Sequence, residues 1–95
     1  MDLTALLAEL EQLAGKLGVT VMYDHFTGDG MSTGGMCKVK GSWRVIIERR
    51  ASDGEKVSIL ARALSGFDLE PHFLSPAARE TVERHRLEAR KDEGG

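Results

Sequence analysis

The stretch from Gly28 to Arg50, GDGMSTGGMCKVKGSWRVIIERR, decides the fold that the rest of the chain completes. Its second part alternates apolar side chains with basic or polar ones, which is the period-two pattern of β-strands. Gly41 and Ser42 interrupt this alternation, and these residue types are typical of turns. The stretch therefore predicts a β-hairpin that follows a glycine-rich connection.

The side chains of the hairpin also predict its register. A two-residue loop would place charged side chains opposite valines, whereas a three-residue loop over 41–43 pairs Val39 with Val45. The same loop pairs Cys37 with Ile47, so we expect Cys37 to point into the core as a small apolar residue. The residues of the opposite face would then be Met36, Lys38, Lys40, Arg44, Ile46 and Glu48.

The glycines before the hairpin do not predict a phosphate site. A phosphate-binding glycine loop opens a helix, whose free amide groups and dipole face the anion. Here a strand pattern follows, and the Gly-Lys-Ser/Thr ending of a P-loop is absent from GDGMSTGG. We interpret these glycines as a connection into the strand.

The residues before this stretch predict a helix and a strand. Leucines recur at three- and four-residue intervals from Leu3 to Leu17, with Asp2 as an N-cap and Gly18 as a terminator. Residues 19–24, VTVMYD, then alternate in the manner of a strand.

The residues after the hairpin predict two further helices. Ser52 and Glu55 have the spacing of a capping box, and the apolar stripe that follows ends at Gly66. Ser75-Pro76 begins a third helix, whose sequence beyond Val82 is charged and carries little apolar stripe. We therefore predict a compact domain over 1–82 and a charged, fraying end over 83–95.

Together these elements predict an α+β fold in the order α-β-β-β-α-α. We expect a small antiparallel three-stranded sheet with two helices packed on one face and a third C-terminal helix. Whether the third helix also covers the other face is left open by its pattern.

The composition excludes several classes of protein. The chain has 95 residues, 41% of them hydrophobic and 29% charged, and its net charge of -2 argues against a nucleic-acid-binding protein. We expect no membrane association, since no apolar run is long enough for a membrane span. One cysteine and the absence of a signal-peptide pattern favour the cytoplasm.

No catalytic constellation is complete. Cys37, His25, His72 and His85 are not at metal-ligand spacing, so we expect no metal and no cofactor. The enzymatic alternatives are a cysteine hydrolase that uses Cys37 with His25 as its base, and a zinc enzyme whose ligands are completed by a second subunit.

Two resemblances accompany this interpretation. The glycine-rich entry, the hairpin with WRVIIERR and the capped helix resemble, over roughly residues 30–66, the small core of ImmA/IrrE-type zinc metallopeptidases. That family carries His-Glu-x-x-His where this chain has Ser58-Ile59-Leu60-Ala61-Arg62, so the resemblance implies a distant relative without the zinc motif. In size and residue usage the chain is also similar to small bacterial regulators of the RomX type, which accompany a Ras-like polarity GTPase.

We therefore expect a non-catalytic protein-binding or regulatory adaptor module that uses the outer face of its hairpin. Its partner would be another protein, or a second copy in a homodimer; regulation of a Ras-like bacterial polarity GTPase is an alternative. The residues predicted to contact the partner are Met22, Met36, Lys38, Lys40, Trp43, Arg44 and Ile46.

Overall fold

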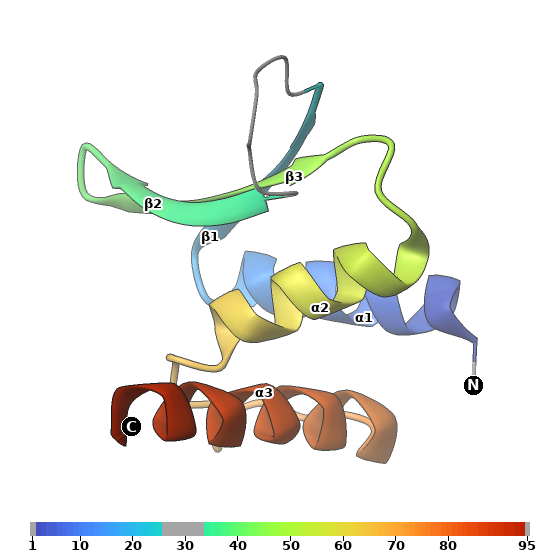
Figure 1. Ribbon diagram of the computed structural model, residues 1–95, viewed down its shortest axis with the longest axis vertical. Coiled ribbons are helices and arrows are strands. Elements are labelled where there is room, and N and C mark those ends of the chain that lie inside the picture. The colour runs from blue at the N-terminus through green and yellow to red at the C-terminus, as the bar shows by residue number, and fades with distance from the viewer. Residues whose placement is uncertain (1, 26–33, 95) are drawn as a thin grey trace.

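The computed structural model describes residues 2–25 and 34–94 of the chain. The described residues form three helices and a three-stranded sheet, arranged in a compact globule (Figure 1). The element order is α-β-β-β-α-α, which confirms the predicted α+β class. The glycine-rich connection over 26–33 lies outside the described residues. The interpretation that these glycines form a connection and not a phosphate site therefore stays a prediction.

The first two helices begin at the predicted caps. Helix α1 spans Leu3–Lys16, and the Asp2 carboxylate accepts hydrogen bonds from the first-turn amides at 3.0 and 3.3 Å. Helix α2 spans Asp53–Leu64, and the Ser52 hydroxyl accepts a hydrogen bond from the amide of Glu55 at 3.2 Å. These contacts satisfy donors that a helix cannot satisfy internally.

Helix α3 spans Pro76–Gly94. It begins at the predicted proline, and the Ser75 hydroxyl accepts a hydrogen bond from the amide of Ala78 at 3.2 Å. The helix continues through the charged segment, so the domain boundary predicted after residue 82 stays a prediction.

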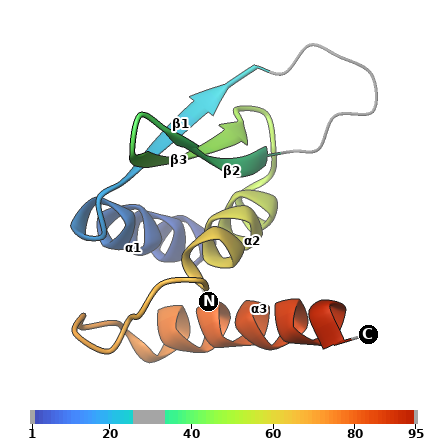
Figure 2. The ribbon, with the colours of Figure 1, turned by 90° about the vertical axis from the view of Figure 1, so that its left-hand side faces the viewer.

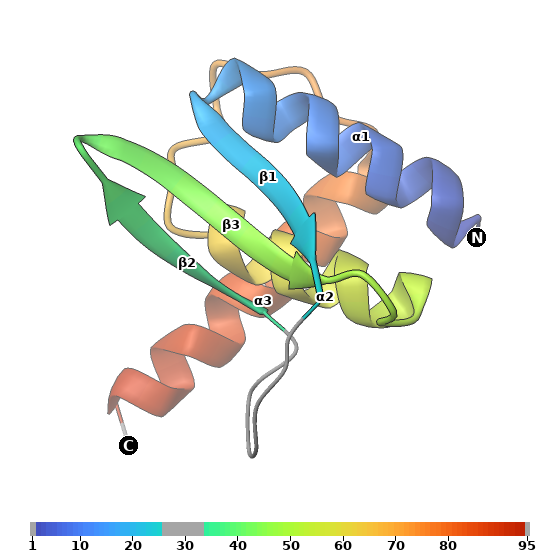
Figure 3. The same cartoon turned by 90° about the horizontal axis from the view of Figure 1, so that it is seen from above.

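The sheet contains β1 (Val19–Asp24), β2 (Gly34–Val39) and β3 (Ser42–Glu48) in the order β1-β3-β2. Strand β2 is antiparallel to β3, but β1 is parallel to it, so the prediction of a wholly antiparallel sheet was wrong. Strand β3 takes the central place because two of its side chains, Val45 and Ile47, are completely buried. With β2 on one side of β3, β1 occupies the other side and runs in the same direction as β3 (Figure 3).

The predicted register of the hairpin was also wrong. The turn has two residues, Lys40 and Gly41, and both have positive φ angles, 50° and 83°. Positive φ at both central positions is the geometry of a type I′ turn, whose twist matches that of the flanking strands. The turn pairs Val39 with Ser42 and Cys37 with Arg44, and Cys37 is exposed on the face away from the helices.

The mixed pairing costs little because β2 lies at the edge of the sheet. Met36 pairs with the buried Val45 and still keeps 38% of its surface exposed. The backbone geometry of the turn therefore sets the register. It outweighs the separation of apolar from charged side chains, on which our prediction of the register was based.

The elements form three layers (Figure 2). Helices α1 and α2 cover one face of the sheet, as predicted, and α3 packs against these two helices on the side away from the sheet. The fully or nearly buried apolar side chains are Leu6, Leu10, Leu13, Ala14, Val19, Val45, Ile47, Val57, Leu60, Ala61, Leu64, Leu69, Leu74, Ala78 and Val82. No described helix covers the other face of the sheet, which answers the question left open by the sequence.

Polar contacts hold α3 in this third layer. The Glu9 carboxylate of α1 accepts hydrogen bonds from the amide and the hydroxyl of Ser75, both at 2.7 Å. Arg86 donates hydrogen bonds to the carbonyl oxygens of Ser65 and Phe67, at 2.9 and 3.0 Å. These bonds join both halves of α3 to the helical layer, because Arg86 lies about three turns beyond Ser75.

The turn geometry gives a prediction about stability. Gly41→Ala places a Cβ at a φ of 83° and should lower the free energy of unfolding by about 1 kcal/mol. Gly15→Ala is the matched control: it lies in α1 with open space around its Cβ, and we expect a gain of about 0.5 kcal/mol. Urea denaturation measures both, and equal effects of the two changes would contradict the type I′ turn.

Candidate protein-binding interface

The face of the sheet that points away from α1 and α2 is the candidate site. Because strand side chains alternate, the buried residues of β1 and β3 identify the inner face, and the residues between them belong to the other. We call this other face the outer sheet face, and Figure 3 views the sheet from this side. Its residues are Thr20, Met22, Asp24, Gly35, Cys37, Val39, Ser42, Arg44, Ile46 and Glu48.

The strand register places these side chains in rows across the sheet. Met22 of β1 lies next to Ile46 of β3, and Gly35 lies on the other side of Ile46. A Cβ built at Gly35 would meet nothing within 4 Å, so this row has open space beside the isoleucine. Met22 keeps 39% of its surface exposed, and the row is therefore an accessible apolar strip.

A second row lies nearer the turn. Arg44 on the central strand has Thr20 on one side and Cys37 on the other. This row places the half-buried Arg44 beside the apolar strip, on the central strand of the outer sheet face. The exposed Lys40 follows at the turn, so the hairpin end of the face is basic.

The opposite end of the sheet carries acidic side chains that have partners. The carboxylate of Asp24 accepts a hydrogen bond from the amide of His25 at 2.7 Å. The carboxylate of Glu48 lies 3.5 Å from the His25 ring and 3.2 Å from Arg50. The carboxylates at this end thus already have hydrogen-bond or ion-pair partners within the chain.

The seven residues predicted to form one contact face do not lie together. Met22, Arg44 and Ile46 are on the outer sheet face, as predicted, and Lys40 is in the turn. Met36, Lys38 and Trp43 belong to the inner side of the sheet, because the register differs by three residues from the predicted one, and an odd shift exchanges the two faces of β2. Gly41 was the signal in the sequence that favoured a two-residue turn.

Trp43 is not an exposed anchor. It is half-buried, and its ring meets that of Phe67 edge to face at a centroid distance of 6.3 Å. The ammonium group of Lys38 lies 5.4 Å from the centroid of the same indole ring. The ring contact attaches the hairpin to the segment that follows α2. Cys37 and Val39, which were not predicted as contact residues, lie on the outer sheet face in place of Met36 and Lys38.

The residues proposed for a cysteine hydrolase lie apart. Cys37 belongs to the row of Thr20 and Arg44, whereas His25 follows the row of Asp24 and Glu48. The two rows are four positions apart along β3, from Arg44 to Glu48. This corresponds to about 13 Å along a strand and exceeds hydrogen-bond reach. Among the side chains of residues 2–25 and 34–88, no three of His, Cys, Asp or Glu form a group that could hold a metal ion.

Of the described residues, Tyr23 has the most strongly shifted pKa. Its hydroxyl donates a hydrogen bond to the Glu11 carboxylate of α1, and the Lys56 ammonium group of α2 lies 5.3 Å from its ring centroid. Burial, followed by the hydrogen bond and the charge of Glu11, raises the pKa of Tyr23 well above its ordinary value of 10.0. A catalytic acid needs a pKa near the working pH, so this phenol joins β1 to the helices and is not suited to proton transfer.

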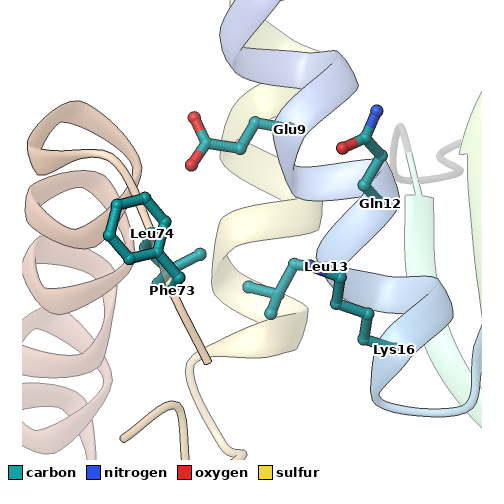
Figure 4. Close-up of a pocket in the computed structure, with 6 residues that line it drawn as sticks. All are labelled: Glu9, Gln12, Leu13, Lys16, Phe73 and Leu74. Atoms are coloured by element: carbon teal, nitrogen blue, oxygen red, sulfur yellow. The ribbon is translucent and has the colours of Figure 1, made fainter. Parts of the chain in front are cut away.

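The described cavities lie on the helical side of the molecule. One of about 260 Å³ lies between α1 and the segment before α3 (Figure 4), and its lining residues are Glu9, Gln12, Leu13, Lys16, Phe73 and Leu74. Another of about 200 Å³ is lined by Asp2, Ala5, Leu6, Glu9, Ser75 and Ala77. Both are smaller than typical ligand pockets, and none of the predicted contact residues lines them.

Comparison with known proteins adds no family to this description. No family model, no curated protein and no solved structure matches the chain. The resemblance to ImmA/IrrE-type peptidases therefore stays a prediction. Among the described helices, none has the length and apolar character needed to cross a membrane.

The exposure of Cys37 predicts its reactivity. We expect the native thiol to react with Ellman's reagent at a rate within roughly tenfold of that of the unfolded chain, because no unfolding step is needed. Cys37→Ser removes the only thiol and serves as the blank. A native rate limited by unfolding would instead support the predicted register with an inward Cys37.

The contact of Tyr23 predicts a loss of stability in alkali. The folded state raises the pKa of Tyr23, so just above pH 10 the phenol ionises in the unfolded chain only. The contribution of this contact to the free energy of unfolding is therefore complete below pH 10 and is lost as the pH rises further. Tyr23→Phe should cost about 1 kcal/mol at neutral pH and flatten this decline. Tyr23 is the only tyrosine, so phenolate absorbance reports it directly, and ionisation at the ordinary pH would contradict the contact.

Proposed function

We propose that this chain is a non-catalytic protein-binding or regulatory adaptor module whose outer sheet face contacts a partner protein. One observation carries the proposal: α3 packs on α1 and α2, and the sheet face opposite them keeps apolar side chains without a described cover. A small domain whose sheet face keeps uncovered apolar side chains has an accessible apolar surface. Such surfaces are characteristic of binding sites.

The composition of the outer sheet face suits a protein partner. Met22 and Ile46 form an apolar strip, and methionine adapts its shape to different contacts. Arg44 lies beside the strip, and arginine is enriched where interfaces concentrate their binding energy. The partner that fits best has apolar side chains next to at least one carboxylate that pairs with Arg44.

The position of Arg44 favours a different protein over a second copy. In a two-fold symmetric dimer each surface patch meets itself, so residues near the centre of the patch approach their own symmetry mates. Arg44 is on the central strand, and two stacked copies would bring two guanidinium groups together. An acidic partner avoids this repulsion and gains an ion pair.

The test begins with a photo-crosslinking amino acid at position 22, on the outer sheet face, and in a second protein at position 84, on the exposed side of α3. Proteins joined at position 22 only are identified by mass spectrometry, purified and titrated against the chain. Ile46→Glu and Arg44→Glu should each weaken binding at least tenfold, as expected for residues at the centre of an interface. The control Arg84→Glu should leave the affinity unchanged.

Several results would contradict the proposal. Crosslinks at position 84 alone, or an affinity that neither substitution changes, would place the interface elsewhere. Crosslinks between copies of the chain would identify a homodimer instead. Because Ile46 is half-buried, Met22→Glu provides a second variant of the same strip, and thermal melting establishes that each variant is folded.

A further inference from the structure

Strand β2 has an open edge. It pairs with β3 on one side, and no other strand of the described sheet pairs with it on the other. Gly35, Met36, Cys37 and Lys38 are all exposed, and the strand contains no proline. A strand edge in this state is able to pair with a further strand, because one row of its backbone groups faces away from the sheet.

The two-residue turn determines which backbone groups form this row. The pair next to such a turn, Val39 and Ser42, exchanges both hydrogen bonds, and bonded and non-bonded pairs then alternate along an antiparallel ladder. Val39 and Cys37 therefore use their backbone groups towards β3. Met36 and Lys38 have their N–H and C=O groups on the open side.

We propose that β2 accepts an extended, acidic segment of a partner protein as a fourth strand of the sheet. The inference rests on the proposed function as a protein-binding module and adds the mode of binding and the chemistry of the bound segment. Main-chain hydrogen bonds from Met36 and Lys38 would supply affinity, as in other cases of strand addition. A strand added here would also extend the outer sheet face sideways.

The charges near the edge favour an acidic segment. From Gly34 to Glu48 the hairpin has three basic residues, Lys38, Lys40 and Arg44, against Glu48 alone, which lies at the far end and contacts His25 and Arg50. Carboxylates on a strand beside β2 would lie within reach of Lys38 and Lys40, because opposed side chains on adjacent strands are close neighbours.

The same lysines oppose pairing with a second copy. If two β2 strands paired antiparallel about Cys37, the Lys38 residues of the two copies would be diagonal neighbours about 7–8 Å apart. Lysines at strand edges commonly prevent such self-association. The occupant that the charges select is therefore a different, acidic chain.

The experiment uses the whole chain labelled with nitrogen-15 and a six-residue peptide of alternating valine and aspartate with blocked ends. Amide hydrogen exchange is followed by nuclear magnetic resonance. At saturating peptide, exchange at Met36 and Lys38 should slow at least tenfold, while Cys37 and Val39, which already bond to β3, change little. A peptide of alternating valine and lysine is the control and should give no protection.

A proline variant tests the backbone bond itself. Met36→Pro removes the outward N–H without removing a bond to β3, whereas Met36→Ala removes only the side chain. Peptide binding to Met36→Ala should be at least tenfold tighter than to Met36→Pro. If the proline variant does not fold, the exchange measurement on the unsubstituted chain decides alone.

The possible failures can be told apart. Absence of protection at Met36 and Lys38 with the acidic peptide overturns strand addition. If Ile46→Glu still weakens the binding of a partner protein in that case, the proposed function stands without it. Protection that rises with protein concentration, without peptide, would show that a second copy occupies the edge and would also overturn the inference. Protection by the acidic peptide that survives in Ile46→Glu supports strand addition independently of the outer sheet face.

Discussion

The left-handed backbone at Lys40 and Gly41 determines which side chains reach each face of the sheet. A turn of two residues sets the pairing of β2 with β3, and a shift of one residue would exchange the two faces of β2. The positions of Cys37 and Met36, the direction of the free amide groups at the β2 edge and the composition of the outer sheet face all follow from this turn. Glycine at position 41 makes the conformation accessible, since it carries no Cβ.

The second constraint is the need to cover two amphipathic helices. One side of α1 and α2 packs on the sheet, and the side that remains is covered by α3 through Ala78 and Val82, which are completely buried. Hydrogen bonds from Ser75 to Glu9 and from Arg86 to the end of α2 hold the helix in place. Because α3 has one short apolar stripe, it covers the helical layer and leaves the outer sheet face without a described cover.

The described residues keep the candidate catalytic side chains apart. Strand rows separate Cys37 from His25, and burial with a bound carboxylate moves the pKa of Tyr23 away from neutrality. The features that remain unused by folding are an apolar strip, a central arginine, basic residues at the turn and an open strand edge. They lie on one hairpin and its neighbour β1, so a single partner can contact all of them.

Local patterns in the sequence determined the helices, the strands and their order. Capping residues such as Asp2 and Ser52 and the spacing of apolar side chains act within a few residues, so they can be read without knowledge of the fold. The direction of β1 and the place of α3 were decided only by tertiary structure, whereas the register of the hairpin follows from the backbone of its turn. They depend on how a twisted turn, a buried central strand and two helices fit together, and side chains distant in sequence, such as Glu9 and Ser75, complete that fit.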